Sequence, residues 1–372
     1  MQWNIERGYE LERILAALRT EKPDIAILQE LDIGCERSGR TNQLEIIAQE
    51  MGYNGGFVAE FEELHCPQTR SARSQGGGFH GNAIFSKYDM DFRVINHRYQ
   101  PINWARDGAA RFQEPRRGQR YTLAATIQPT FPGSESLRPR PIQAYSAHLE
   151  VFCGLSHRIA QFAELLEDAY QTSGQYLHQL LFGDMNTLAH SLARLSPKYC
   201  QDRFRWRSWG STEAQWWFDH VLSTHRAPLP PGTPVPVAPI TKPDDDQLVS
   251  EKPAGSKEVP AASSSTTVTG PDGTTTTTVA PLKESTQTNP HLEKFGTSVF
   301  PREVLRMAIN PGFSEPWDLN QDNTLQNFYG LYKGKLDWTL LMGFECLSRH
   351  MGNENYLASD HKYLIVYLAY KD

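Results

Sequence analysis

The stretch Leu180-Leu181-Phe182-Gly183-Asp184-Met185-Asn186-Thr187 is the pattern around which the rest of this sequence is arranged. Its three apolar residues predict a short buried strand, and Gly183 lets the backbone turn tightly where that strand ends. Asp184 and Asn186 are two positions apart, so on extended backbone their side chains share one face. A carboxylate can take a proton from water, and a carboxamide can donate to a phosphoryl oxygen while staying uncharged. The pattern suits a site for water and phosphate, although Asp-x-Asn is equally typical of turns and helix caps.

The N-terminal part of the chain alternates between apolar runs and helical periodicity. Residues 2–6 and the all-apolar run 25–28 predict strands, the second of them central and buried. Apolar residues three and four positions apart predict amphipathic helices over 11–18 and 44–51, and Gly52 ends the latter.

Strand signals dominate the middle of the chain and return near its C-terminus. Apolar or alternating runs between Gly, Pro and charged clusters predict further strands. They cover residues 79–85, 92–97, 121–127, 142–148, 336–342 and 363–370. Another amphipathic helix is predicted around 159–169, directly before the Asp184 strand. Helices and strands are thus mixed along the chain without an internal repeat, as in one compact α/β unit.

The composition changes abruptly at about residue 226. From there to about residue 293 the chain is rich in Pro, Thr, Ser, Lys and Asp and almost free of aromatic and long aliphatic residues. Such a segment cannot bury enough apolar surface to offset its ordering entropy. We therefore expect a single domain over residues 1–372, interrupted by a disordered Pro/Thr/Ser-rich insertion at about 226–293.

Bulk composition narrows the classes of function. The chain has 372 residues and a net charge of −6, so it lacks the overall basic field that grips nucleic acid non-specifically. A local positive rim would still serve a nuclease. The cysteines are odd in number and include no Cys-x-x-Cys pair, which indicates neither a zinc site nor a disulfide framework. They are Cys35, Cys66, Cys153, Cys200 and Cys346.

The sequence shows no targeting or membrane signal. It has no Asn-x-Ser/Thr sequon, no long apolar run and no signal-peptide h-region. The simplest expectation is a reduced intracellular setting, in the cytoplasm or nucleus, without stable membrane insertion. Because residues 1–5 read as a strand already in progress, the natural start of the protein can lie upstream.

Polar side chains at the ends of the first two predicted strands are further candidates. Glu30 ends an apolar run, where a charge is costly unless something binds it. It fits a ligand for a hard cation such as Mg²⁺, or else a salt bridge or helix cap. Asn4 can orient a carboxylate or the attacking water, or satisfy neighbouring backbone groups. Glu6 reads as a surface salt-bridge residue.

Two histidines also lie near strand ends. His80 and Asn82 enter a strand from a run of glycines, which permits close approach of a ligand to backbone but is equally typical of a flexible loop. His148 follows the run Ala144-Tyr145-Ser146-Ala147. It is either a catalytic candidate or a hydrogen-bonded structural residue.

The C-terminal third supplies an acid–histidine pair. Asp337 lies inside an otherwise apolar strand, and Ser359-Asp360-His361 precedes the last strand. A buried Asp near a His holds one imidazole tautomer and raises the pKa of the ring, which can then stay cationic against a phosphate. Asp360 could contact a metal directly, although Ser-Asp-His is also a common turn sequence.

Taken together and in order, seven short motifs resemble the endonuclease/exonuclease/phosphatase superfamily, which has the DNase I-like fold. The motifs are Trp3-Asn4-Ile5, Leu28-Gln29-Glu30, His80-Gly81-Asn82-Ala83-Ile84, Ser146-Ala147-His148-Leu149, Gly183-Asp184-Met185-Asn186, Leu336-Asp337-Trp338 and Ser359-Asp360-His361. The resemblance implies an α/β fold, a four-layer sandwich of two packed mixed β-sheets flanked by helices. The site would lie where the strand-end loops converge. The resemblance also implies hydrolysis of a phosphoester with Mg²⁺ or Mn²⁺.

The same resemblance implies roles for individual residues. Glu30 would be the main ligand of the Mg²⁺ or Mn²⁺ ion, with Asn4 and Asp360 nearby. Asp184 would activate or orient the attacking water, and Asn186 would hold this water or a phosphoryl oxygen.

Two histidines complete the implied catalytic set. His361, oriented by Asp337, would stabilise the pentacovalent transition state, and His148 would contact the same phosphate from the other side. A metal and a cationic histidine together neutralise the charge that slows phosphodiester hydrolysis. The remaining candidates, expected to bind substrate, are His80, Asn82 and Arg116.

The leading hypothesis for the substrate is nucleic acid, cleaved by an endo- or exonuclease-like phosphodiesterase. Residues 203–209 combine arginines with aromatic residues that could clamp phosphates and stack on bases, and residues 116–120 could form part of a basic rim. The tryptophans of this region are alternatively core residues of a helix; they are Trp206, Trp209, Trp216 and Trp217.

Two other functions stay open on the sequence alone. A lipid or inositol-phosphate phosphoesterase, sphingomyelinase-like or phosphoinositide phosphatase-like, would need an exposed aromatic-aliphatic loop for membrane contact. An inactive binding scaffold would be free to lose a catalytic position, yet every candidate position holds the expected residue type. The long insertion departs from the family. Asn4–Gly8 and Glu114–Arg116 resemble uncharacterised microbial members and specify neither substrate nor protein partner.

Overall fold

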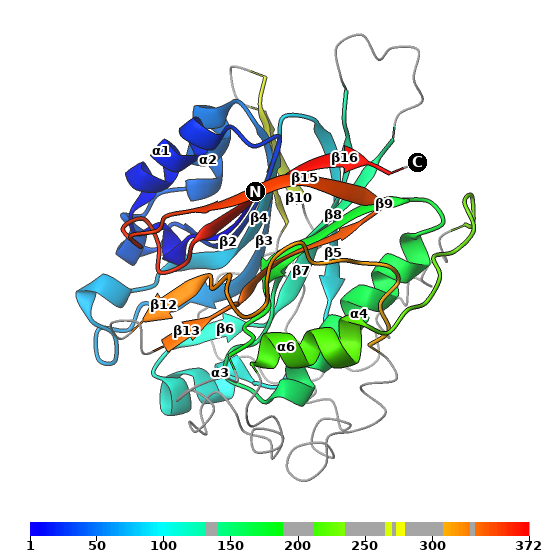
Figure 1. Cartoon of the computed structure of the whole chain (residues 1–372). Coiled ribbons are helices and arrows are strands. Elements are labelled where there is room, and N and C mark those ends of the chain that lie inside the picture. Colours follow the sequence, from blue (N-terminus) through cyan, green and yellow to red (C-terminus); the bar gives the residue numbers. More distant parts are fainter. Residues whose placement is uncertain are drawn as a thin grey trace, which may run out of the picture.

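Two β-sheets pack face to face, and helices cover the outer face of each sheet (Figure 1). The computed structural model describes residues 1–130, 140–188, 212–234, 265–269, 273–279, 308–327 and 332–371. Helices α1 (Leu11–Glu21) and α2 (Gln43–Met51) cover one sheet. Helices α4 (Leu155–Thr172) and α6 (Glu213–Trp217) cover the other. The four-layer α/β arrangement expected from the sequence is therefore confirmed.

The first sheet contains nine strands in the described ranges. Its order is β10-β11-β3-β4-β2-β1-β16-β15, with β6 paired to β3. In chain order these strands are β1 (Gln2–Asn4), β2 (Ile25–Ile33), β3 (Asn54–Glu63), β4 (Gly78–Ser86), β6 (Arg116–Gly118), β10 (Ser265–Thr269), β11 (Thr275–Val279), β15 (Phe344–Gly352) and β16 (Tyr363–Tyr370).

The second sheet has five strands in the order β14-β9-β8-β7-β5. They are β5 (Asp89–Asn96), β7 (Tyr121–Gln128), β8 (Ile142–His148), β9 (His178–Asp184) and β14 (Asp337–Met342). A separate hairpin pairs β12 (Leu325–Asn327) with β13 (Tyr332–Gly334). The short helical segments are α3 (Trp104–Asp107), the 3₁₀ turns Glu6–Gly8, Glu36–Ser38 and Ala72–Ser74, and the π-helical turns Gly108–Phe112 and Phe218–Leu222.

Three apolar layers hold this sandwich together. The layer between the sheets includes Ile27, Ile84, Leu180 and Phe182, all fully or nearly fully buried. A second layer lies between the first sheet and helices α1 and α2, and a third lies between the second sheet and helices α4 and α6. Buried apolar area is the main stabilising term in such a core, so the strand ends that emerge from it are rigidly supported.

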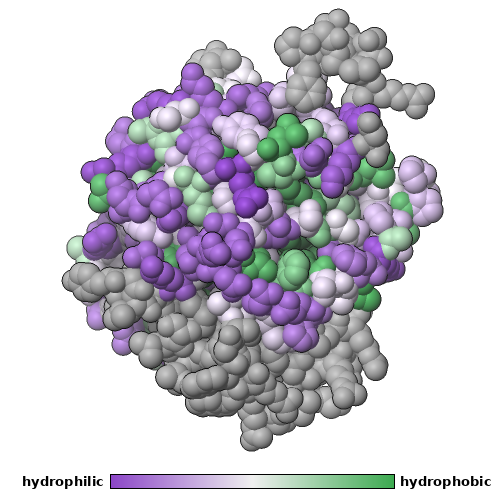
Figure 2. Space-filling model, viewed as in Figure 1, coloured by the Kyte–Doolittle hydropathy of each residue, from purple (hydrophilic) through white to green (hydrophobic). Residues whose placement is uncertain are grey.

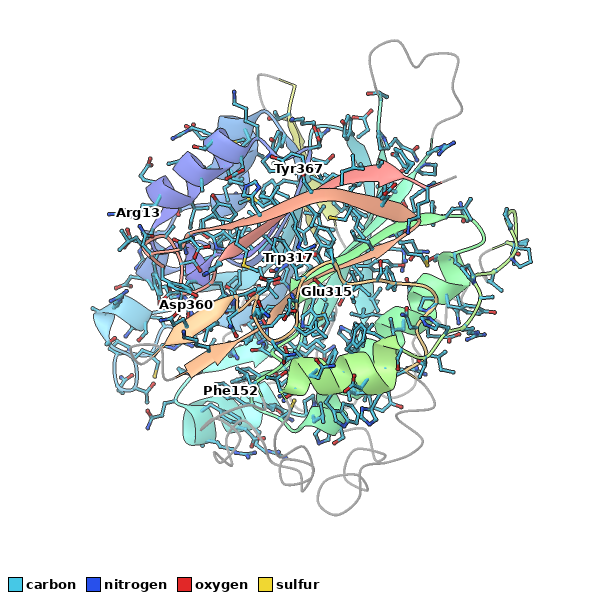
Figure 3. The ribbon with its side chains drawn as sticks, viewed as in Figure 1. Arg13, Phe152, Glu315, Trp317, Asp360 and Tyr367 are labelled. Carbon is cyan, nitrogen blue, oxygen red and sulfur yellow. The ribbon has the colours of Figure 1, made fainter. Side chains whose placement is uncertain are left out.

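A partly buried segment around Glu315 covers the edge strand β14. Residues Ser314 and Leu341 form a backbone bridge, and the Glu315 carboxylate accepts the Thr339 N–H at 2.9 Å. The Trp317 indole N–H donates to the Thr339 hydroxyl at 2.8 Å; Figure 3 shows Glu315 and Trp317 close together over this strand. Covering an edge in this way removes unpaired backbone groups from solvent.

The register of the strands brings their polar ends together. Strands β8 and β9 are parallel, with His148 beside Asp184, and β14 runs antiparallel to β9, with Asp337 opposite Asp184. Strand β1 is parallel to β2 and places Asn4 beside Gln29. Polar residues that are far apart in sequence therefore meet at one edge of the sandwich.

Seven strands of the described ranges were not predicted from the sequence: the short β6, β12 and β13, the strands β10 and β11, and the longer β3 and β15. Strand β3 begins Asn54-Gly55-Gly56, which reads as a turn. Gly56 nevertheless lies within the sheet, where a larger residue does not fit because its Cβ would overlap the Phe92 ring. Strand β15 is an edge strand with mostly exposed or half-exposed residues, so it lacks an apolar run. Both cases reflect tertiary packing that local composition does not record.

The expected insertion at 226–293 lies largely outside the described residues. Where it is described, it contains the paired strands β10 and β11, and β11 lies parallel to β3 at the edge of the first sheet. The β-branched threonines of these two strands favour extended backbone, and the disordered insertion over 226–293 as a whole stays a prediction. Within the described ranges, no helix is both long and apolar enough to cross a membrane.

Candidate functional site

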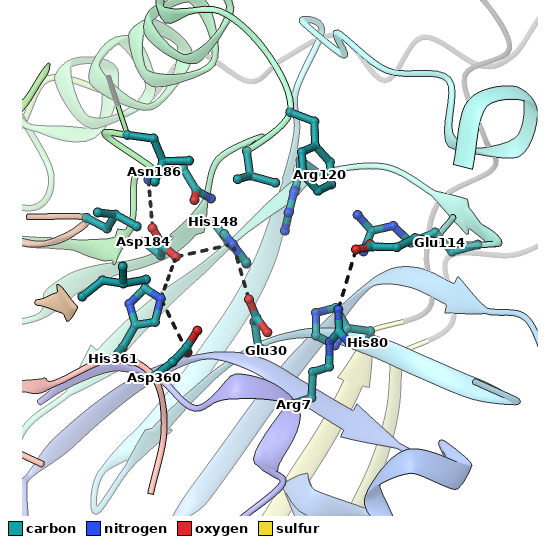
Figure 4. Close-up of a pocket in the computed structure, with 16 residues that line it drawn as sticks. Arg7, Glu30, His80, Glu114, Arg120, His148, Asp184, Asn186, Asp360 and His361 are labelled. Carbon is teal, nitrogen blue, oxygen red and sulfur yellow. Dashed lines mark hydrogen bonds and ion pairs between the residues drawn. The ribbon is translucent and has the colours of Figure 1, made fainter. Parts of the chain in front are cut away.

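A pocket of about 300 Å³ opens where the ends of β2, β8 and β9 meet the loop before β16 (Figure 4). Carboxylates of Glu30, Asp184 and Asp360 line one half of it. Guanidinium groups line the other half, and His148 lies between the two (Figure 4). The pocket therefore separates negative from positive side chains across a short distance.

Unusual backbone conformations direct several of these side chains into the pocket. Glu30 has a φ of 63° and lies at an irregularity in the pairing of β2 with β4. Asn186, Glu6 and Arg7 also have positive φ, at 49°, 47° and 60°. Left-handed backbone is costly for residues with a Cβ and persists where the surrounding structure enforces it, often at functional sites.

Asn4 links the first strand to two carboxylates. Its amide nitrogen donates to Glu30 Oε1 at 3.1 Å and to Asp184 Oδ2 at 3.0 Å. Its amide oxygen accepts the Glu6 backbone N–H at 3.0 Å. Asn4 is 1% exposed and does not itself line the pocket. The structure thus brings it to the site as an orienting residue.

His361 is held by a buried carboxylate. Its Nδ1 lies 2.7 Å from Asp337 Oδ2, and the Gln2 amide donates to the other Asp337 oxygen at 3.2 Å. Burial alone would lower the pKa of His361, but Asp337 and Asp360 outweigh it and raise that pKa well above its ordinary value. The ring is consequently cationic, with Nε2 3.9 Å from Asp184 Oδ2.

Asp184 combines burial with well-formed hydrogen bonds. Its Oδ1 accepts the Asn186 backbone N–H at 2.8 Å, and its Oδ2 accepts the Asn4 amide. Burial raises the pKa of Asp184 to about 6, partly offset by His361. The Asn186 amide nitrogen donates to the Leu149 carbonyl at 2.8 Å, which fixes that side chain at the pocket wall.

His148 joins the two halves of the pocket. Its Nε2 lies 3.7 Å from Asp184 Oδ2 and 4.0 Å from Glu30 Oε1, while its Nδ1 faces Glu60 Oε2 at 3.9 Å. Burial, followed by the positive charge of Arg120, lowers the pKa of His148 well below its ordinary value. The ring is neutral at pH 7 and can donate or accept a hydrogen bond.

The acidic half has the donor set of a hard-cation site. Burial and the nearby Asp360 raise the pKa of Glu6 to about 7, and burial with Glu30 and Asp184 raises the pKa of Asp360 against the opposing effect of His361. A cation would relieve this mutual repulsion. Within the described residues, no cluster of three or more His, Cys, Asp or Glu encloses a metal position. Mg²⁺ is usually bound by one or two carboxylates and several waters, which Glu30 and Asp360 satisfy.

Two of the three residues expected to bind substrate line the pocket, and the third does not. His80 and Arg116 line the pocket, and His80 Nδ1 lies 2.8 Å from Asp32 Oδ1. Asn82 does not line it; this side chain is fully buried in β4, and neither of its amide atoms has a hydrogen-bond partner among the described residues. Asp337 also lies behind the pocket wall, where it contacts His361.

Several site residues were not predicted from the sequence. Glu6 is half-buried and accepts the Asp360 N–H at 3.0 Å, so its assignment to a surface salt bridge is wrong. Arg7, Glu114 and Arg120 line the pocket as well. The alternation of arginines after Glu114 could have indicated which of them point inward.

The basic-aromatic segments have different outcomes. Residues 203–209 lie outside the described residues. Trp216 and Trp217 are buried in the apolar layer under α6, which confirms the alternative that they are core residues. In the segment 116–120, Arg117 is exposed, whereas Arg116 and Arg120 are buried at the pocket wall.

The chain resembles known proteins both in sequence and in fold. The sequence profile of the Endonuclease/Exonuclease/phosphatase family matches residues 1–254. Among solved structures, an endonuclease/exonuclease/phosphatase from Beutenbergia cavernae DSM 12333 superimposes with a TM-score of 0.51 at 14% identity, covering 99% of this chain and 70% of that chain. At this identity the likeness shows the fold.

Two further structures overlap less well. A functionally unknown conserved protein from Enterococcus faecalis V583 has a TM-score of 0.45 at 12% identity, covering 99% of this chain and 98% of that chain. The 3′ phosphatase NExo from Neisseria, bound to product DNA hairpin, has the same TM-score, identity and coverage. No curated protein matches the chain.

Proposed function

The chain belongs to the endonuclease/exonuclease/phosphatase family of hydrolases that act on phosphoester bonds, and we propose that it is a divalent-metal-dependent phosphodiesterase acting on nucleic acid. One observation carries the proposal. The cationic His361 ring, held by Asp337, faces the buried Asp184 carboxylate at 3.9 Å in a pocket that also contains a cation-suited carboxylate pair. This combination matches the needs of phosphoester hydrolysis, which are a positioned water and stabilisation of negative charge.

The residues divide this work between them. Asp184, with a pKa of about 6, accepts a hydrogen bond from the attacking water and takes its proton as the new P–O bond forms. Its orientation is fixed by the hydrogen bonds from Asn4 and the Asn186 backbone. Because both donors are in place beforehand, little reorganisation is needed during the reaction.

The histidines stabilise the phosphorus centre. His361 donates its Nε2–H to a phosphoryl oxygen, and Asp337 prevents loss of the Nδ1 proton. The neutral His148 contacts the same phosphate through Nε2 from the far side of Asp184. Two donors on opposite sides resist rotation of the phosphate as it passes through the pentacovalent, trigonal-bipyramidal transition state.

Glu30 and Asp360 would hold the Mg²⁺ or Mn²⁺ ion, with Asn4 orienting Glu30. When bound, such an ion supplies Lewis-acid charge that neutralises the phosphate and the leaving oxygen. Burial raises the pKa of Glu30, but His80 and Arg7 outweigh it and lower the net pKa. Glu30 is therefore ionised and available as a ligand across the neutral pH range.

Nucleic acid is favoured over other phosphoesters by the lining of the pocket. Cationic side chains lie beside the apolar Val151 and Phe152, so a phosphate and a flat base or sugar can be accommodated together. The face shown in Figure 2 is largely hydrophilic, with apolar residues in small groups between charged ones. A membrane-binding surface would instead need a continuous apolar patch.

A hydrolysis screen tests the proposal. Wild-type protein and Asp184→Asn would be compared with Mg²⁺ on single- and double-stranded DNA, RNA, sphingomyelin and inositol phosphates. The exposed Asp318, whose carboxylate accepts surface-loop N–H groups, provides the matched control Asp318→Asn. We expect nucleic-acid cleavage that falls about 10²- to 10⁴-fold in Asp184→Asn alone. Cleavage of only lipid or inositol phosphates would overturn the substrate, and inactivity on all of them would leave a binding scaffold.

A further inference from the structure

Three arginines line the pocket, Arg7, Arg116 and Arg120, here called the arginine wall. Figure 4 shows Arg7 and Arg120 on the side of the pocket away from Asp184 and Asp360. Arg116 and Arg120 are 5% and 3% exposed. Arginine is rarely buried to this extent without a structural or binding reason, because removing its charge from water is costly. The catalytic roles of Asp184 and His361 do not use this wall.

Aromatic rings fix the direction of the wall. The Arg116 guanidinium lies 3.5 Å from the centre of the Trp104 ring and 3.9 Å from that of Phe61. Arg120 Nη1 donates to Glu60 Oε2 at 2.8 Å. A guanidinium stacked in this way loses little conformational entropy when a ligand binds. The wall is therefore preorganised.

The wall has unused hydrogen-bonding capacity. Among the residues that the structure describes, the buried Nε atoms of Arg116 and Arg120 have no hydrogen-bond partner, nor does Nδ1 of the adjacent His148. Buried polar atoms in folded proteins almost always have partners. Burial, together with repulsion from Arg120, lowers the pKa of Arg116 despite Glu114 and Glu63. Glu63 approaches Arg116 Nη1 only to 3.6 Å and Glu150 approaches Arg120 Nε only to 3.8 Å, so these ion pairs are longer than charge-assisted hydrogen bonds.

One carboxylate already approaches the place where an anion would bind. Glu114 lies 3.3 Å from Arg116 Nη1 and 3.9 Å from Arg7 Nη2, and its side chain is 27% exposed. These distances are those of loose ion pairs, because a charge-assisted hydrogen bond is about 2.8 Å long. Glu114 is thus a weakly held acid between two arginines.

We propose that the arginine wall binds a second, non-reacting phosphate of the substrate, which takes the place of the Glu114 carboxylate between Arg7 and Arg116. This inference rests on the proposed phosphodiesterase activity and adds a specificity determinant to it. The second phosphate can belong to a neighbouring nucleotide or to a phosphorylated polyol, since both present anionic phosphoryl oxygens. The planar arginine fork suits either one.

Paired substrates test the proposal. Thymidine 5′-(p-nitrophenyl phosphate) and its 3′-phosphorylated form share one scissile bond and differ by one phosphate; inositol mono- and bisphosphate form a second pair. The measured quantity is the ratio of kcat/KM for the doubly to the singly phosphorylated member. We expect wild type to prefer the doubly phosphorylated member in one of the pairs, and that pair identifies the source of the second phosphate.

Removing a positive and removing a negative side chain of the pocket should change this kcat/KM ratio in opposite directions. Arg7 is 26% exposed on its side chain, so Arg7→Gln should fold, and it should lower the ratio about tenfold. Glu114→Gln removes the competing acid and should raise the ratio severalfold. Arg117→Gln is the matched control, because Arg117 is 60% exposed and pairs with Glu62 outside the pocket. A structural role would lower kcat/KM in both pocket variants without opposite changes in the ratio.

A binding measurement separates this proposal from the proposed activity. Titration of inorganic phosphate into chelator-treated protein, followed by calorimetry, needs no turnover. We expect binding that Arg7→Gln weakens, Glu114→Gln strengthens and Arg117→Gln leaves unchanged. If no substrate is hydrolysed but this pattern holds, the activity fails and the anion site stands. Equal ratios in all four proteins, or phosphate binding that ignores Arg7 and Glu114, would overturn the arginine wall as a second phosphate site.

Discussion

Asn82 provides a test in which stability and activity should change in opposite directions. This residue lies in the middle of β4, fully buried, on the same face as His80 and Ile84. Both atoms of its amide lack a hydrogen-bond partner in the described part of the chain. Ile84 belongs to the apolar layer between the sheets. The Asn82 amide, two positions away, is therefore a polar group without a hydrogen-bond partner beside an apolar layer.

The size of the effect follows from the missing hydrogen bonds. A buried polar group without a partner costs about 1–3 kcal/mol. Leucine has the branched shape of asparagine without its polarity, so Asn82→Leu should raise the free energy of unfolding by about 2 kcal/mol. For a chain of this length the melting temperature should rise by about 4 °C. Activity should fall about tenfold, because natural chains retain such local conflicts mainly at functional sites.

Chemical denaturation and a phosphodiester assay on the same preparations measure both effects. Ser86→Ala is the control, because Ser86 is also buried in β4 but its hydroxyl accepts the Tyr88 N–H at 3.0 Å. That control should lose about 1 kcal/mol. Asn82→Val, a smaller substitution, separates overpacking from lost hydrogen bonding. If both Asn82 variants are destabilised and fully active, the amide is satisfied in the folded protein and our reasoning is refuted.

Three other outcomes can be measured. Gln2→Met should cost about 1–3 kcal/mol and lower kcat more than it raises KM, because Gln2 donates to Asp337 at 3.2 Å behind His361. Glu63 is buried among Arg37, Arg70 and Arg116, and although burial raises the pKa of Glu63, these arginines lower it below the ordinary 4.5. Its contribution to stability is therefore complete above pH 4.5 and is lost as the pH falls further. Glu63→Gln should lower the free energy of unfolding by about 3–5 kcal/mol at pH 7. Its melting temperature should fall less than that of wild type as the pH is lowered. His361→Ala should lose most turnover and should also lower the melting temperature, because it leaves the buried Asp337 carboxylate without its partner; normal turnover would exclude His361 from the reaction.

Much of the site was predictable because its residues lie at the ends of apolar strands. A strand such as Ile25–Leu28 or Leu180–Phe182 fixes its own position by burial, so the polar residue that follows is placed at a known edge of the sheet. Glu30, Asp184 and His148 were found in this way and all line the pocket. Asp337 was identified as a charge in an apolar run, and the structure places it against His361.

The residues that escaped prediction depend on backbone conformation or on long-range packing. Left-handed backbone, at φ values of 47° and 60°, lets Glu6 contact the Asp360 N–H and Arg7 line the pocket, and no local composition specifies this conformation for such residues. Arg120 points inward because β3 supplies Glu60, and that strand was hidden by its initial glycines. Sequence patterns indicate which residues are buried and whether a segment has the period of a helix or of a strand. They do not indicate which distant carboxylate pairs with which arginine.

The separation of charge within the pocket fixes how an anionic substrate must enter it. Before a cation binds, Glu30 and Asp360 repel a phosphate, whereas the arginine wall attracts one, so an unreacting anionic group is drawn to the wall first. His148 does not blur this separation, because burial and Arg120 keep its ring neutral. With one phosphate at the wall, the neighbouring ester is held beside His361 and Asp184, whose Nε2 and Oδ2 lie 3.9 Å apart. Selectivity for a doubly phosphorylated substrate and orientation of its scissile bond then have the same electrostatic cause.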